Sequence, residues 1–141
     1  MSAPLHDRQA AAGRQGAEFE KAVEILLLCQ NWTIQERHWR EPTINVEIDF
    51  VATDPSGETW WIECKGSWES PTVNGLERTD TLKKAIGSAA LLRLLDERKR
   101  YMVITSHLPR VGTAGEQWLQ RAFEAYFDAV EVVGFGQGAT Q

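Results

Sequence analysis

Long apolar runs and cysteines are scarce in this 141-residue sequence. No run approaches the roughly 20 apolar residues that a membrane span needs, and the N-terminus has no apolar core of a signal peptide. Cys29 and Cys64 lie in apolar stretches without the spacing of a metal site, so we expect small core residues and no disulfide. These absences predict a cytoplasmic protein with no membrane partner.

Positive charge and histidine are also scarce. The 15 Lys and Arg residues against 20 Asp and Glu give a formal net charge of -5. This charge argues against a protein that coats nucleic acid by bulk electrostatics, but it is compatible with a nuclease whose carboxylates hold a metal ion. The histidines His6, His38 and His107 are far apart in the sequence and lack metal-ligand spacing. We therefore do not expect a histidine-based catalytic site.

The length and the apolar pattern predict one α/β domain. We expect a flexible tail over residues 1–12, a single domain over 13–135 and a second flexible tail over 136–141. The predicted order is αβββαβαβ, which implies a central mixed β-sheet flanked by helices on both faces. The predicted elements are a helix from about 13 to 31, strands over 32–39, 44–53 and 58–65, a helix over 79–95, a strand over 101–105, a helix over 118–126 and a strand over 129–133.

The turn at residues 54–57 (DPSG) fixes the register of a hairpin. If Gly57 takes a left-handed conformation in a three-residue loop, Asp49 falls opposite Glu63. Opposed residues share a face, so the two carboxylates should stand about 5 Å apart at their Cβ atoms, with Lys65 beside Glu63 on that face. The same alternation places Val46, Ile48 and Phe50 together on one face.

Two opposed carboxylates repel each other, and a divalent cation such as Mg²⁺ or Mn²⁺ would relieve the repulsion. A lysine beside the cation can position water and neutralise charge that develops on a phosphate. The residues alone leave another interpretation open, in which Glu63 and Lys65 form an ordinary ion pair on a solvated strand face.

The motif residues resemble those of the PD-(D/E)xK nuclease superfamily. The resemblance rests on GAEFE at 16–20, Ile48-Asp49 and Glu63-Cys64-Lys65, and with the order of elements around them it spans about residues 13–105. No proline precedes Asp49, which departs slightly from the motif. The resemblance implies a restriction-endonuclease-like core and a relation to Mrr-like restriction enzymes or Holliday-junction resolvases.

The resemblance also implies roles for the motif residues. Asp49 and Glu63 would bind Mg²⁺ together with the backbone carbonyl of Cys64, Lys65 would position the attacking water, and Mn²⁺ would substitute. The implied activity is a metal-dependent endodeoxyribonuclease that leaves 5′-phosphate and 3′-hydroxyl ends. The helix acid would be Glu20.

The helical wheel does not separate Glu20 from Glu18, and the spacing of the superfamily favours Glu20. A solvated helix edge with Lys21 is the open alternative for both glutamates.

Basic and aromatic residues outside the motif could contact DNA, with RNA as another possible substrate. The candidates are Lys83 and Lys84 near a helix N-terminus, the loop residue Trp68, and Arg37 and Arg40. The alternative to DNA contact for Lys83 and Lys84 is a solvated surface position that only aids solubility. For Trp68 the alternative is packing against the rest of the protein. A resolvase would act as a symmetric homodimer. A different class of function is a non-catalytic nucleic-acid-binding subunit of a larger complex.

Overall fold

The computed structural model describes residues 5–67, 75–96 and 99–134, with residues 5–15 described by their backbone alone. The candidate Trp68 and the predicted tail over 136–141 lie outside these residues. The first helix begins at Leu5, so residues 5–12, expected as a flexible tail, are helical instead. The run of glutamine and alanine over 9–12 favours helix, which accounts for the earlier start.

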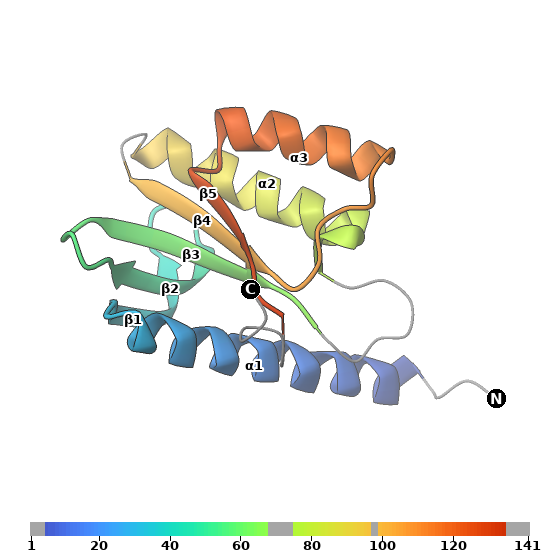
Figure 1. Cartoon of the computed structure of the whole chain (residues 1–141), viewed down its shortest axis with the longest axis horizontal. Helices are drawn as coiled ribbons and strands as arrows, with labels where there is room; N and C mark the ends of the chain where they lie inside the picture. The colour runs from blue at the N-terminus through green and yellow to red at the C-terminus, as the bar shows by residue number, and fades with distance from the viewer. Residues whose placement is uncertain (1–4, 68–74, 97–98, 135–141) are drawn as a thin grey trace.

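The described chain is an α/β fold in which a five-stranded mixed sheet lies between helices (Figure 1). The strands lie side by side in chain order; the first three are antiparallel, and the last two run parallel to the third. The bounds are α1 Leu5–Cys29, β1 Thr33–Glu41, β2 Val46–Thr53, β3 Thr59–Lys65, η1 Gly75–Glu77, α2 Thr79–Leu95, β4 Arg100–Thr105, α3 Ala114–Ala125 and β5 Ala129–Val132. The predicted order of helices and strands is confirmed, with the short 3-10 helix η1 added before α2.

Each face of the sheet carries its own buried core. Helix α1 covers one face, and α2 with α3 covers the other (Figure 1). The α1-side core consists of Phe19, Val23, Leu27, Phe50, Ala52, Ile62, Met102 and Ile104. The α2-side core consists of Ile48, Val51, Trp61, Leu76, Leu82, Ala85, Ala89, Leu92, Tyr101, Val103, Ala122 and Phe127. Strand β4 supplies both cores, which explains its continuous apolar sequence.

The β2–β3 hairpin has the predicted register. Asp54 N donates to the carbonyl of Glu58 at 2.8 Å, and Gly57 takes a positive φ of 95°. Pairing extends from Thr53 opposite Thr59 to Phe50 opposite Ile62, and this is the register that the turn predicted. Local turn chemistry therefore sets the alignment of the two strands that carry the motif.

The alternation of β2 breaks at Asp49. Val46 and Ile48 pack with the α2-side core, whereas Phe50 packs in the α1-side core, so the predicted common face of these three residues is wrong. The paired residues of β1 and β2 pass over His38 and Asp49, although the pairs on either side, Arg37 with Phe50 and Trp39 with Ile48, keep one register. Asp49 and Phe50 both face the cleft beside α1, so alternation breaks between these two neighbours.

The end of β3 is in close contact with α1 and with the neighbouring strand β4. A Cβ atom at Gly66 would lie 2.6 to 2.7 Å from ring atoms of Phe19, so a glycine is needed where α1 packs against this segment. On the β4 side, the hydroxyl of the fully buried Thr105 donates to the carbonyl of Lys65 at 2.7 Å. These contacts fix the position of the last residues of β3 between α1 and β4.

The two cysteines have different surroundings. Cys29, the last residue of α1, is exposed, so its predicted place in the core is wrong. Helix α1 buries the stripe Phe19, Val23 and Leu27, and Cys29 falls outside that stripe. Cys64 is half-buried and packs against the α1-side core.

Candidate functional site

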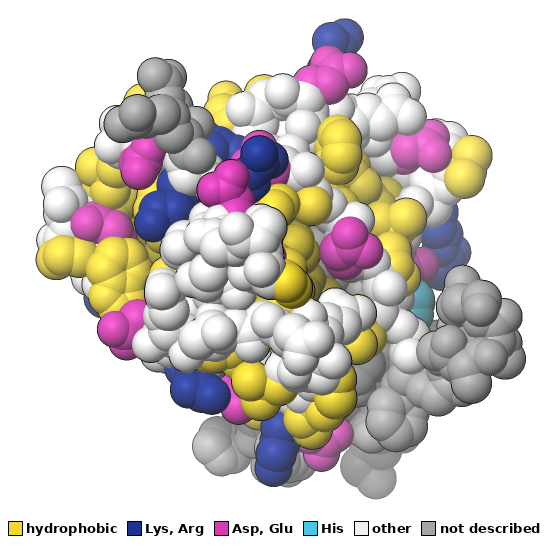
Figure 2. All heavy atoms as spheres, turned by 60° about the vertical axis from the view of Figure 1, so that its left-hand side comes forward, with side chains coloured by type: hydrophobic (Ala, Val, Ile, Leu, Met, Phe, Trp, Pro, Cys, Tyr) yellow, Lys and Arg dark blue, Asp and Glu magenta, His cyan; other side chains and the backbone are white. Residues whose placement is uncertain are grey.

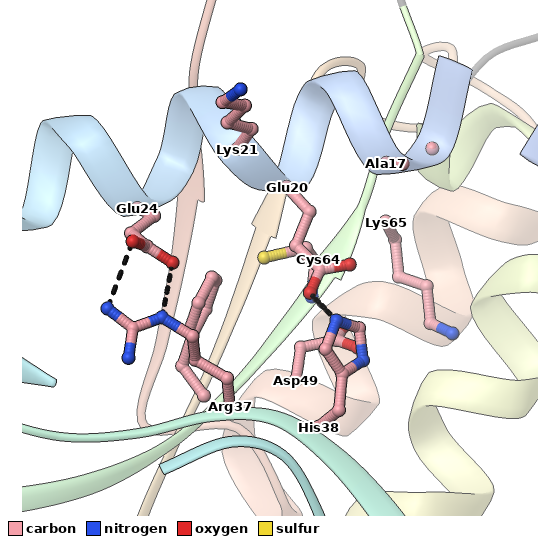
Figure 3. Close-up of a pocket in the computed structure, with 11 residues that line it drawn as sticks. Ala17, Glu20, Lys21, Glu24, Arg37, His38, Asp49, Cys64 and Lys65 are labelled. Carbon is pink, nitrogen blue, oxygen red and sulfur yellow. Dashed lines mark hydrogen bonds and ion pairs between the residues drawn. The ribbon is translucent and has the colours of Figure 1, made fainter. Parts of the chain in front are cut away.

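A cleft of about 610 Å³ opens between α1 and the first three strands (Figure 3). Four residues predicted for the catalytic site line it: Glu20, Asp49, Cys64 and Lys65. The other lining residues are Gly16, Ala17, Lys21, Glu24, Arg37, His38 and Phe50. The fold thus brings together motif residues from α1, β2 and β3.

Glu20 is the acid that α1 contributes to the cleft. Its carboxylate points away from the helix toward His38 and Asp49, and Oε1 lies 2.6 Å from His38 Nε2 (Figure 3). Glu18 is exposed and does not line the cleft, so the structure places Glu20 rather than Glu18 there. Burial, and next the charge of Asp49, raises the pKa of Glu20 to about 7.

Asp49 is held in place by the neighbouring strand. Its Oδ2 accepts a hydrogen bond from the backbone N–H of Cys64 at 2.8 Å. Burial raises the pKa of Asp49 above its usual value, while the Cys64 N–H and the charge of Lys65 act in the opposite direction. The carboxylate is therefore fixed in orientation and poorly solvated.

Glu63 is buried and pairs with Lys65. Its side chain is 6% exposed, and its Oε2 lies 3.4 Å from Lys65 Nζ. Burial, and next the charge of Asp49, raises the pKa of Glu63 to about 8, although Lys65 opposes this shift. Glu63 is not among the residues that line the cleft, so its predicted metal ligation together with Asp49 stays a prediction.

His38 is a cleft residue that the sequence analysis set aside. Its backbone φ is 50°, its Nε2 lies 2.6 Å from Glu20, and its Nδ1 lies 3.4 Å from Glu47 Oε1. In the register of β1 and β2 it stands opposite Asp49. Pairing the strands around the turn at 42–45 could have found it, because that register sets the histidine against the motif aspartate.

The donor set of the cleft fits a divalent cation. Glu20, His38 and Asp49 each offer one ligand atom, and these atoms all lie within 4.8 Å of one another. Two poorly solvated carboxylates close together are unfavourable when both are ionised, and a cation offsets that repulsion. Glu20, His38 and Asp49 are thus the cleft residues that could hold a divalent cation.

The residues predicted to contact nucleic acid have other partners in the described structure. Arg37 makes a two-point ion pair with Glu24, with distances of 2.7 and 3.0 Å (Figure 3). Arg40 donates to the carbonyl of Asn45 at 2.9 Å.

The predicted helix lysines lie outside the cleft, which Arg37 lines. Lys83 Nζ lies 5.0 Å from the ring centre of Trp118, and Lys84 is exposed. On the face in Figure 2, the Lys and Arg side chains of the described residues are interspersed with Asp and Glu rather than gathered in one area. A contact of any of these basic residues with DNA stays a prediction.

Comparison of the chain with protein-family models, with curated proteins and with solved structures found no match. Among the described residues, no helix has the length and apolar character needed to cross a membrane. The cleft residues therefore carry the functional argument by themselves.

Proposed function

We propose that the chain is a metal-dependent endonuclease of the PD-(D/E)xK type, which hydrolyses DNA phosphodiester bonds to 5′-phosphate and 3′-hydroxyl ends. One observation carries the proposal. Glu20, Asp49 and Lys65 come from three separate elements and line a single cleft, and Glu63 contacts Lys65. A restriction-endonuclease-like core would account for the position of α1 next to the β2–β3 hairpin.

The energetics of the acids also support a functional site. Burial raises the pKa of Glu63 to about 8 and of Glu20 to about 7, so both carboxylates are costly to ionise in the folded protein. Groups with strongly shifted pKa values that gather in a cleft are typical of catalytic sites. A solvated strand face with an ordinary Glu–Lys pair would not bury Glu63 to 5% exposure.

Each motif residue has a distinct task in the proposed reaction. Asp49 and Glu63, with Glu20 and the Cys64 carbonyl, would hold a divalent cation, which would supply charge neutralisation and Lewis acidity toward the phosphodiester. The Cys64 N–H keeps the Asp49 carboxylate oriented.

Lys65 and Glu20 act beside the residues that orient and hold the cation. The Lys65 ammonium, a quarter exposed and held by Glu63, can donate a hydrogen bond to water or to a phosphate oxygen. Glu20 faces the cleft from α1 and would complete the set of carboxylates around the cation.

The test is cleavage of a panel of nucleic acids by the full chain. Supercoiled plasmid, single-stranded DNA, a four-way junction and a structured RNA would be incubated with Mg²⁺, Mn²⁺ or EDTA. Lys65→Ala is the site variant, and Arg121→Ala, an exposed cation on α3 across the sheet from the cleft, is the matched control. Circular dichroism checks that both variants fold.

The proposal expects metal-dependent cutting of at least one DNA, 5′-phosphate ends, loss of more than about 100-fold in Lys65→Ala, and full activity in Arg121→Ala. Preference for the junction would point to a resolvase, and cutting of RNA alone would replace DNA as the substrate. Cutting that survives in Lys65→Ala, or no cutting of any substrate with either metal, overturns the proposal.

A further inference from the structure

We infer that His38 is a metal ligand, and that Glu20, His38 and Asp49 form a mixed nitrogen–oxygen site that selects Mn²⁺ or a similar transition-metal cation over Mg²⁺. The inference deepens the proposed function, on which it rests for its catalytic meaning. It concerns the identity of the cation and adds a residue outside the PD-(D/E)xK motif.

The three side chains converge from different parts of the fold. Glu20 comes from α1, His38 from β1 and Asp49 from β2, and their ligand atoms lie within 4.8 Å of one another. Figure 3 shows the imidazole of His38 beside Asp49, directly below the carboxylate of Glu20. One cation can contact all three donors with small side-chain movements.

The backbone places the imidazole in the cleft at a conformational cost. His38 has a φ of 50°, in the left-handed region that non-glycine residues adopt infrequently, and the β1–β2 ladder leaves it unpaired with Asp49. Arg37 and His38 contact the α1 acids Glu24 and Glu20, so two successive side chains of β1 face α1 and the alternation breaks between them. In the register of β1 and β2 His38 stands across from Asp49, so both side chains can reach the cleft beside α1.

The two ring nitrogens of His38 have separate partners. Nδ1 lies 3.4 Å from Glu47 Oε1, and Nε2 points to the Glu20 carboxylate in the cleft. A carboxylate that accepts the other ring N–H is the usual support of a metal-binding histidine, because it fixes the tautomer and the ring orientation. Glu47 can thus leave Nε2 as the ligand atom.

The donor chemistry indicates the class of cation. Mg²⁺ prefers an all-oxygen shell and binds imidazole poorly, whereas Mn²⁺ and the later first-row cations accept nitrogen ligands. Glu20 and Asp49 alone would serve Mg²⁺ and Mn²⁺ similarly. The nitrogen of His38 therefore adds affinity mainly for the transition-metal cation. The competing account is that His38 only forms ion pairs with Glu20 and Glu47.

The test is calorimetric binding of MnCl₂ and of MgCl₂ to the metal-free full chain at one fixed pH. His38→Gln removes the imidazole and keeps hydrogen-bonding groups for Glu20 and Glu47. His107→Gln is the matched control, since His107 lies in the loop after β4 and contacts Ser106. The inference expects a loss of at least tenfold in Mn²⁺ affinity for His38→Gln, with Mg²⁺ affinity changed less than about twofold, and no change for His107→Gln.

An unchanged Mn²⁺ affinity in His38→Gln, or an equal loss for both cations, overturns the inference in favour of a plain ion pair. Absence of Mn²⁺ binding to the unaltered chain also overturns it. The outcomes are separate from those of the cleavage panel. Selective Mn²⁺ binding without any cutting would overturn the nuclease proposal and leave the metal inference standing. Mg²⁺-dependent cutting with unaltered Mn²⁺ binding in His38→Gln would overturn the metal inference and leave the nuclease proposal standing.

Discussion

Glu63→Gln should stabilise the metal-free protein at alkaline pH while it removes a motif residue. Glu63 is 5% exposed, and Lys65 is its ion-pair partner. Burial, and next the charge of Asp49, raises its pKa from 4.5 to about 8. The folded state therefore binds the proton of Glu63 more tightly than the unfolded chain does, and ionisation of this carboxylate opposes folding.

The magnitude follows from the shift. The stabilisation from protonated Glu63 is fully present below pH 4.5 and is lost as the pH rises toward about 8. Linkage over the interval from pH 5 to pH 8 gives a loss of about 3 to 4 kcal/mol from this one group. Since a domain is typically stable by about 5 to 15 kcal/mol, the loss is a large fraction of the total.

Urea unfolding followed by tryptophan fluorescence, in EDTA at pH 5 and pH 8, measures the effect. The unaltered protein should lose about 3 to 4 kcal/mol more than Glu63→Gln between the two pH values, whereas Glu18→Gln, an exposed acid on α1, should behave like the unaltered protein. Parallel losses in the unaltered protein and in Glu63→Gln would refute the reasoning, because they would mean that Glu63 is solvated.

Two further substitutions test the contacts that hold the end of β3. Gly66→Ala should lower the free energy of unfolding by about 1 to 3 kcal/mol, because its methyl group would overlap the ring of Phe19. Urea unfolding checks this, with Gly87→Ala, where a Cβ meets nothing within 4 Å, as a control that should not lose stability. Thr105→Val should cost about 1 to 3 kcal/mol, since it leaves the carbonyl of Lys65 without its donor. Thermal unfolding should show a smaller loss for Thr105→Ser, and equal losses would argue that packing, not the hydroxyl, matters.

The sequence was sufficient for the hairpin because local turn chemistry decides its register. Asp54 and Gly57 determine the turn, and the turn determines the register up to Phe50. The spacing of the superfamily favoured Glu20 where the helical wheel did not separate it from Glu18, and of the two it is Glu20 that lines the cleft, while its catalytic role stays a prediction.

The remainder of the site depends on tertiary contacts that periodicity does not encode. Regular alternation put Ile48 and Phe50 on one face, and the structure places them in different cores. The scattered histidines gave no reason to expect a catalytic role for His38, yet it contacts Glu20, and its neighbour Arg37, a candidate for DNA contact, pairs with Glu24. Glu20 and Glu24 of α1 both contact residues of β1. The sequence contains no short-range signal that pairs a helix with a strand 13 or more residues away.

The break in β2 gives Asp49 two tasks, and substitutions can separate them. Where the β1–β2 ladder skips this residue, its carboxylate instead accepts the backbone N–H of Cys64. Asp49→Asn keeps an oxygen for that N–H and removes the poorly solvated charge, so the variant should fold at least as stably as the unaltered protein at pH 8. Asp49→Ala leaves the N–H without its acceptor and should cost about 1 to 3 kcal/mol relative to Asp49→Asn in urea unfolding. Equal stability of the two variants would show that the Cys64 contact contributes nothing to folding. With the expected difference, Asp49→Asn becomes the variant in which a loss of metal binding reports on the cleft and not on the sheet.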